Sequence, residues 1–236
     1  MSESASSTST PLVVNRPLTA ASRRDFLRAL GVGSAVVLMP SMFAACSSDA
    51  TGITRGSNAA VTLDLSTDVG VLNYAYALEQ LEAAFYEAAL KNIISGCSAT
   101  ELHALLQIGQ HEIVHREFLK AALGSSAIPA LQVDFSSIDL TKRDSVLQAA
   151  KTFEDTGVAA YNGAGRLLHS AAYLVLAGKI VSVEARHAAT IRDLLNPKSM
   201  DFAGDDVIDA NGLDRALAPS AVLPLVAPFI VTPISA

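Results

Sequence analysis

Residues 105–122, LLQIGQHEIVHREFLKAA, decide the fold of this chain. Their apolar positions recur at intervals of three and four residues, which predicts a helix with one buried face. Glu112 and His115 fall on the same face as the apolar residues. A carboxylate and an imidazole one turn apart are therefore predicted to point into the interior of the protein.

Three other stretches with helical periodicity also carry a carboxylate on their apolar face. Glu184 and His187 form a second Glu-x-x-His motif in one of them, and Glu82 and Glu154 lie in the other two. Random placement of nine Glu and five His in 236 residues would give this motif about 0.2 times, so two copies are a strong signal. We expect each of four helices to bury at least one carboxylate.

The spacing of these residues suggests an internal repeat. The interval from Glu82 to Glu112 equals the interval from Glu154 to Glu184. One constant shift along the chain therefore superimposes Glu82 on Glu154 and the first Glu-x-x-His motif on the second. This shift also selects Glu82 over its neighbour Glu79, since Glu79 would fall on a lysine in the second half. The two carboxylates of each predicted antiparallel hairpin then lie at the same distance from its turn and therefore side by side.

The breaks between periodic segments define four helices. Gly96 interrupts the first segment, and Ser98 with Glu101 forms a capping box that opens the second. The first helix is predicted from Asp68 to about Ile94, the second from Ser98 to Gly124, the third from near Thr141 to a turn at His169, and the fourth from that turn to Asn196.

The connection over residues 124–141 is long enough to cross the bundle. Helices of about 25 residues are about 37 Å long, and a connection of roughly 17 residues reaches about 55 Å when extended. The chain is therefore predicted to be all-α, a four-helix bundle of two antiparallel hairpins joined by a long crossover over residues 68–196. Residues 197–236, with five prolines, are predicted to wrap this bundle as a C-terminal extension.

Four carboxylates in a dry bundle centre would repel one another unless they bind protons or cations. Two divalent metal ions would neutralise them, with His115 and His187 completing the coordination. Oxygen and imidazole ligands without thiolate favour iron first and manganese second, and zinc by affinity alone. A metal-free polar network is the third reading of these residues.

Composition limits the other function classes. The formal charge is −6 and the sequence pI is about 5.3, with no cluster of basic residues beyond the first 30 positions, so a nucleic-acid partner is not expected. Two cysteines, Cys46 and Cys97, exclude a disulfide scaffold and a thiolate metal cluster. The sequence indicates no oligomeric state.

Residues 1–46 have the features of an export signal. Arg23 and Arg24 resemble the arginine pair of a twin-arginine signal, and the apolar run over residues 29–45 is too short to span a bilayer. The run ends in Phe43-Ala44-Ala45-Cys46, which resembles a lipobox. The expected partners are the twin-arginine export machinery and, if Cys46 is acylated, a membrane. Residues 47–67 would then be a tether, and the protein would lie in the periplasm or cell envelope.

Alternatives remain for the cysteines. Cleavage after Ala45 by an ordinary signal peptidase would leave the protein without a lipid. Cys97 would be a free thiol if Cys46 is acylated, whereas the two cysteines can form a disulfide if neither is modified.

Residues 68–196 resemble the ferritin-like superfamily in their four carboxylates and two Glu-x-x-His motifs. The stretches LEAAFY over residues 81–86 and FEDTGVAAY over residues 153–161 resemble a bacterial ferritin-like branch related to desiccation-related proteins. The resemblance implies that Glu112 and Glu184 bridge two metal ions, that Glu82 and Glu154 are terminal ligands, and that His115 and His187 each anchor one metal.

The same resemblance implies two functions. One is redox chemistry on a small oxidant, O₂ or peroxide, as in an oxidase, peroxidase or catalase-like enzyme. The other is non-catalytic metal binding in protection of the cell envelope against stress. Among the remaining polar residues, His103, His111 and His169 are expected on solvated faces or at the hairpin end. Tyr86 and Tyr161 are expected in the core, and the alternative is that they contact the metal ligands or take part in redox chemistry. Asp155 and Asp193 are candidates for orienting the imidazoles.

Overall fold

The structure is a computed structural model that describes residues 59–92 and 96–236. The predicted export signal with Arg23 and Arg24, the acylation site Cys46 and the first part of the predicted tether lie outside the described residues. Within the described part of the chain, no helix is both long and apolar enough to cross a membrane.

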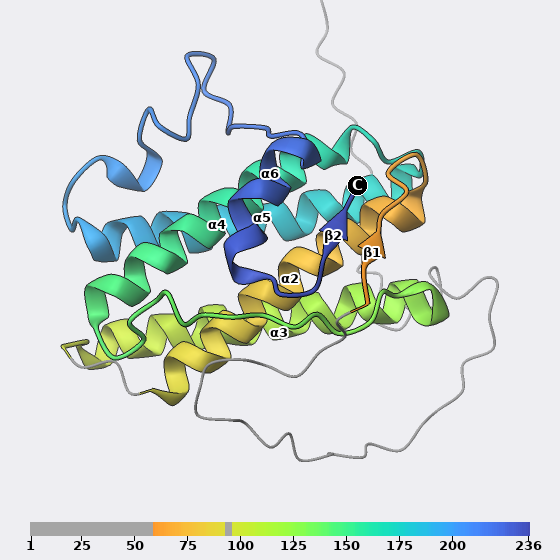
Figure 1. Cartoon of the computed structure of the whole chain (residues 1–236). Coiled ribbons are helices and arrows are strands. Elements are labelled where there is room, and N and C mark those ends of the chain that lie inside the picture. The colour runs from red at the N-terminus through yellow and green to blue at the C-terminus, as the bar shows by residue number, and fades with distance from the viewer. Residues whose placement is uncertain (1–58, 93–95) are drawn as a thin grey trace, which may run out of the picture. The chain divides into compact units, whose positions relative to one another are not determined.

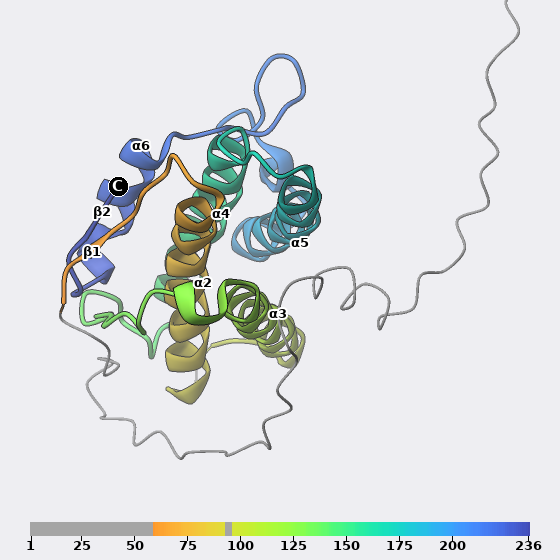
Figure 2. The same cartoon turned by 90° about the vertical axis from the view of Figure 1, so that its right-hand side faces the viewer.

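Four long helices form the body of the described part of the protein (Figure 1). Helix α2 pairs with α3 in one hairpin, and α4 pairs with α5 in the other (Figure 2). The prediction of an all-α four-helix bundle is confirmed. The helices span Asp68–Lys91 (α2), Ala99–Leu123 (α3), Arg143–Gly165 (α4) and Ala171–Leu195 (α5).

Side-chain caps fix where the helices begin. Ser98 and Glu101 form the predicted capping box at the start of α3, in which each side chain accepts a hydrogen bond from the other residue's backbone N–H. Asp68, the first residue of α2, accepts hydrogen bonds from the backbone N–H groups of His169 and Ser170 at 2.6 and 3.0 Å. The start of the first hairpin therefore holds the turn of the second.

The crossover between α3 and α4 runs along the bundle (Figure 1), beginning with a short 3-10 turn, η1 (Gly124–Ser126). Two polar side chains of α2 hold it in place. The amide of Asn73 donates to Ser126 O at 2.9 Å and accepts from Ile128 N at 2.8 Å, and Gln80 Oε1 accepts from Leu131 N at 2.8 Å. Three backbone groups of this long loop are thus satisfied by the helix that it crosses.

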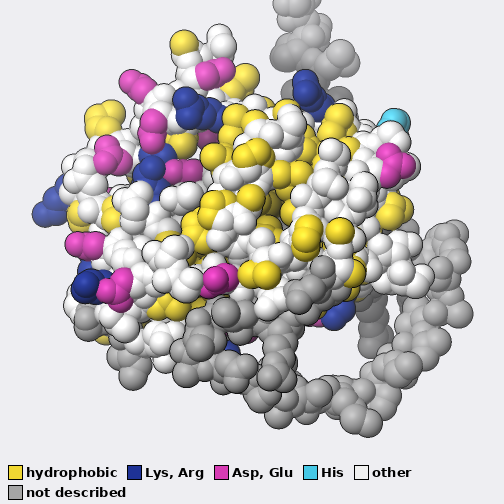
Figure 3. Space-filling model, viewed as in Figure 1, with side chains coloured by type: hydrophobic (Ala, Val, Ile, Leu, Met, Phe, Trp, Pro, Cys, Tyr) yellow, Lys and Arg dark blue, Asp and Glu magenta, His cyan; other side chains and the backbone are white. Residues whose placement is uncertain are grey.

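The C-terminal extension packs on α5 through η2 and on α4 through α6 (Figure 2). Val222 and Val226 insert into the main core, and hydrophobic side chains gather over this part of the surface (Figure 3). Arg192 is only 3% exposed and ties the extension to α4 through ion pairs with Asp155 and Asp206. The elements are η2 (Asp201–Ala203), α6 (Pro219–Val226), η3 (Ala227–Phe229) and strand β2 (Ile234–Ser235), which pairs in parallel with β1 (Val61–Thr62).

Candidate metal centre

Seven titratable side chains from all four long helices meet inside the bundle. The five carboxylates are at most 3% exposed, and the two imidazoles are at most 9% exposed. Burial of this many ionisable groups costs free energy unless they are neutralised together. They are Glu79 and Glu82 of α2, Glu112 and His115 of α3, Glu154 of α4, and Glu184 and His187 of α5.

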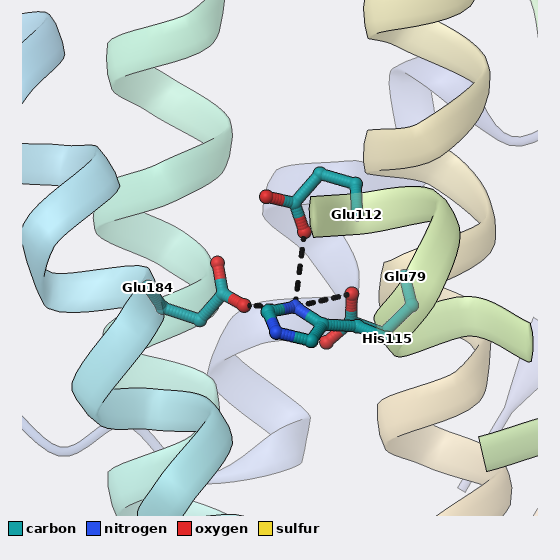
Figure 4. A group of neighbouring side chains, drawn as sticks. All are labelled: Glu79, Glu112, His115 and Glu184. Atoms are coloured by element: carbon teal, nitrogen blue, oxygen red, sulfur yellow. Dashed lines mark ion pairs between the residues drawn. The ribbon is translucent and has the colours of Figure 1, made fainter. Parts of the chain in front are cut away.

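One group of potential ligand atoms is centred on His115. Its Nδ1 lies 2.7 Å from Glu184 Oε1, 3.5 Å from Glu112 Oε2 and 3.6 Å from Glu79 Oε2. Figure 4 shows the three carboxylates around the imidazole ring. Because one donor atom from each of these four residues lies within 4.8 Å of the others, the group has the size of a single metal site.

A second group of the same kind is centred on His187. Its Nδ1 lies 2.7 Å from Glu112 Oε1, 3.4 Å from Glu184 Oε2 and 3.5 Å from Glu154 Oε2. Glu112 and Glu184 belong to both groups and present a different oxygen to each imidazole. Two sites that share two carboxylates are the arrangement expected for a pair of bridged metal ions.

Two phenols connect α2 and α4 at this level. Tyr86 of α2 donates a hydrogen bond to Glu154 Oε1 of α4, and Tyr161 of α4 donates to Glu79 Oε1 of α2, both at 2.5 Å. Both tyrosines are buried in the core, as expected, and each hydroxyl also holds one carboxylate of the cluster, as the alternative expects.

The structure brings Glu79, which the repeat argument excludes, into the cluster beside the predicted ligand Glu82. Glu79 belongs to the His115 group, whereas Glu82 lies in neither group of four donors. The shift that superimposes α3 on α5 does not apply to the other two helices. A slightly longer shift relates α2 to α4, and it superimposes Glu79 on Glu154 and Tyr86 on Tyr161. The recurring Glu-x₆-Tyr spacing is the sequence signal that identifies Glu79.

Glu82 lies within the cluster without occupying either group. It is 3% exposed, and its Oε2 has no hydrogen-bond partner among the described residues. The shift that relates α2 to α4 superimposes Glu82 on Gly157, and a Cβ atom added at Gly157 would lie 2.8 Å from Glu82 Oε1. The missing side chain at Gly157 therefore provides the space for the fifth carboxylate.

The expectation that His111 lies only on a solvated face is incomplete. Although it is exposed on α3, its Nδ1 lies 2.9 Å from His187 Nε2, and the two rings stack with centroids 5.1 Å apart. The sequence signal for this contact is its position on α3, one turn before His115. The predicted orienting role of Asp155 is not observed, since this carboxylate pairs with Arg192 and Lys151.

The three remaining polar residues lie elsewhere. His103 and His169 are exposed, as predicted, and His169 pairs with Asp68 at 3.6 Å. Asp193 is exposed on α5, and among the described residues it forms no hydrogen bond or ion pair with either imidazole of the cluster.

Burial and mutual charge control the protonation of the cluster. Burial raises the pKa of Glu79 and Glu82 well above the usual value and raises that of Glu154 to about 8. Burial opposes the charging of His115 and His187, but the adjacent carboxylates prevail and raise the pKa of both imidazoles to about 12. Without metal, the cluster therefore retains protons at neutral pH.

The donor set fits metal ions better than it fits a closed hydrogen-bond network. Nine nitrogen and oxygen atoms of these seven side chains are buried without a well-formed hydrogen bond in the described structure. Such atoms are rare in stable proteins, and they are concentrated here at one place. Carboxylate oxygen and imidazole nitrogen are also the ligand types that suit iron, manganese and zinc.

Comparison with protein families gives the same result for the fold. Residues 67–197 match the model of the ferritin-like domain, which covers more than half of the chain. The chain belongs to the ferritin-like domain family. The matched region contains α2 to α5, and hence all seven side chains of the cluster. A search of curated proteins gives no match. The buried acidic and imidazole cluster of this ferritin-like domain is compatible with a metal-binding site.

Proposed function

We propose that the protein holds two metal ions, iron or manganese, and that this centre carries out redox chemistry on a small oxidant. The observation that carries the proposal is the pair of donor groups that share Glu112 and Glu184. Glu79 with His115 would hold one metal, and Glu154 with His187 the other. A bound pair of such metals supplies one electron from each ion to an oxidant.

The number of carboxylates supports a redox-active metal. Five buried carboxylates balance up to five positive charges, which is one more than two divalent ions carry. Glu82, which is in neither group, provides this additional charge. Iron and manganese become more positive on oxidation, whereas zinc does not, so the fifth carboxylate favours iron or manganese.

The other residues of the site exclude water and fix the carboxylates. Tyr86 and Tyr161 are 0% and 7% exposed. The hydroxyl of Tyr86 donates to one oxygen of Glu154, and the hydroxyl of Tyr161 donates to one oxygen of Glu79. The second oxygen of each carboxylate remains without a hydrogen bond, and it is the atom that lies toward an imidazole. The phenols thus orient Glu79 and Glu154 as ligands.

Anaerobic loading followed by addition of an oxidant tests this function. The protein loaded with ferrous iron, and separately with manganese, is mixed with dissolved oxygen or with hydrogen peroxide, and the absorbance is followed in time. We expect oxidation of both ions of the centre. A protein that binds metal but reacts with neither oxidant would instead support non-catalytic metal binding in envelope protection.

We further propose that the protein is exported and acts in the cell envelope. Arg23, Arg24 and the apolar run before Cys46 support export by the twin-arginine route, which carries folded proteins and would allow metal insertion before export. Substitution of both arginines by lysine should retain the protein inside the cell. Cys46→Ser should release it from membranes if Cys46 is acylated, and it should leave the distribution unchanged if cleavage occurs without acylation.

A further inference from the structure

A narrow apolar cavity runs inside one end of the bundle. Its lining comes from all four long helices, and it extends along α2 from Val71 to Leu78, a length of about 10 Å. Its volume is about 30 Å³. The residues at the turn between α4 and α5 are half-buried, whereas those at the inner end are buried. We call this cavity the apolar channel.

The inner end of the apolar channel lies beside the proposed metal centre. Leu78 precedes Glu79 on α2, and Ile180 lies one turn before Glu184 on α5. Tyr161 both lines the channel and donates its hydroxyl hydrogen to Glu79. A molecule that travels from the half-buried end to the inner end would therefore arrive next to the His115 group of donors.

The walls of the channel determine which molecules can enter it. Aliphatic and aromatic carbon atoms form almost the entire lining, although Tyr74, Tyr161 and Tyr173 contribute phenol rings. A cavity of about 30 Å³ is large enough for a small molecule, but water needs two to four polar partners and is not retained in an apolar cavity. Hydrogen peroxide has the same need for hydrogen bonds, so the channel disfavours it.

We propose that the apolar channel admits molecular oxygen to the metal centre, so that dioxygen rather than peroxide is the oxidant used through this route. Dioxygen is small, uncharged and apolar, which matches the volume and lining of the channel. This inference rests on the proposed redox function of the centre, because a route for an oxidant has a purpose only if the centre reacts with one.

Xenon provides a test that does not depend on metal. It is an apolar atom that occupies dry apolar cavities in proteins, so it serves as a probe for the same space. Crystals of the protein under xenon pressure should show a bound atom between Leu78, Tyr161 and Ile180. Absence of xenon from the channel in protein that is properly folded would overturn the proposal, whether or not the protein contains metal.

Two blocking variants test the route. Ala122→Phe on α3 and Ala177→Leu on α5 place larger side chains in the channel from half-buried positions. Ala121→Phe and Ala172→Leu make the same changes at exposed positions of the same helices and serve as matched controls. Because the two blocking positions lie on different helices, loss of folding in one variant leaves the other available.

The readout is the rate at which each oxidant oxidises iron in the loaded protein. We expect the blocking variants to react with dioxygen more slowly by about tenfold, equivalent to a barrier higher by about 1.4 kcal/mol, with an unchanged rate for hydrogen peroxide. Equal slowing with both oxidants, or no slowing with either, would contradict the proposal. Failure of the proposed function would give a different result. The protein would then bind no metal, or its metal would not be oxidised, while xenon would still occupy the apolar channel.

Discussion

The hydroxyl of Tyr161 on α4 donates a hydrogen bond to Glu79 on α2, and Tyr86 on α2 returns the same contact to Glu154 on α4. This reciprocal pair relates the two halves of the bundle, because one shift along the chain superimposes Glu79 on Glu154 and Tyr86 on Tyr161. Each hydrogen bond joins a carboxylate of one hairpin to a tyrosine of the other hairpin. The two hairpins are thus joined at the level of the metal centre by polar contacts as well as by apolar packing.

Removal of either phenol hydroxyl should destabilise the metal-free protein. Tyr161→Phe leaves Glu79 Oε1 buried without its donor, and such an unsatisfied group costs about 1 to 3 kcal/mol. Urea denaturation of the metal-free protein measures the difference. Tyr173→Phe, at a half-buried position outside the cluster, is the control and should change the stability little. Equal stability of Tyr161→Phe and the wild type would contradict the assigned hydrogen bond.

Gly157 and Glu82 should behave as a coupled pair. Gly157→Ala places a Cβ atom 2.8 Å from Glu82 Oε1, and overpacking of this kind costs about 1 to 3 kcal/mol. In a Glu82→Ala background the same change should be neutral or stabilising, because alanine is favoured over glycine inside a helix by about 0.5 to 1 kcal/mol. A double-mutant cycle measured by thermal unfolding tests this, and additive effects would exclude the proposed contact.

His111 should influence the metal held by His187. Its ring contacts His187 Nε2, so it orients the imidazole whose Nδ1 lies toward the carboxylates. Loss of such an orienting partner typically weakens metal affinity by about 10- to 100-fold. Competition with a chromogenic chelator compares His111→Ala with His103→Ala, an exposed histidine of the same helix. Identical affinities in the two variants would leave His111 without a role in orientation.

The stability of the metal-free protein should fall as the pH rises. Folding raises the pKa of Glu79 and Glu82 above 4.5 and that of His115 and His187 from 6.5 to about 12. Groups that bind protons more tightly in the folded state stabilise it below their unfolded pKa and lose this contribution as the pH rises. The adjacent imidazoles lower the pKa of Glu112 to about 2, so this carboxylate increases the stability of the folded state as the pH rises. That contribution has its full value above about pH 4.5, and it therefore does not change the trend at higher pH.

Metal should reverse this pH dependence. Metal ions compete with the protons of the cluster, so their affinity should increase with pH. Thermal unfolding between about pH 6.5 and about pH 9 should show decreasing stability without metal and increasing stabilisation by metal. Calorimetric titration in buffers of different ionisation enthalpy should detect proton release on binding. Binding without proton release would mean that the cluster is already deprotonated.

The helices and most of the cluster could be predicted because their signals are local. Periodic apolar residues place Glu112, His115, Glu184 and His187 on buried helix faces, and Ser98 with Glu101 marks the start of α3. A single repeat shift applied to all four helices excludes Glu79. Helices α2 and α4 instead follow a slightly longer shift, which only their packing, or the Glu-x₆-Tyr spacing, makes evident.

The partners of the cluster depend on tertiary contacts. His111 lies one turn before His115 on α3, but this position alone does not show that α5 brings His187 Nε2 within 2.9 Å of its Nδ1. The space for Glu82 arises from Gly157 on another helix. Asp155, although it follows the predicted ligand Glu154, forms an ion pair with Arg192, which also pairs with Asp206 of the C-terminal extension. Helical periodicity does not predict these contacts.

Elemental analysis of the purified full chain tests the central claim most directly. After anaerobic incubation with ferrous iron and removal of unbound metal, the wild type should contain two equivalents of iron, as the two donor groups require. Glu112→Gln with Glu184→Gln should lose both ions, since both groups share these carboxylates, whereas Glu117→Gln on the exposed side of α3 should retain them. A wild-type protein that remains folded and helical but binds no metal would contradict the account.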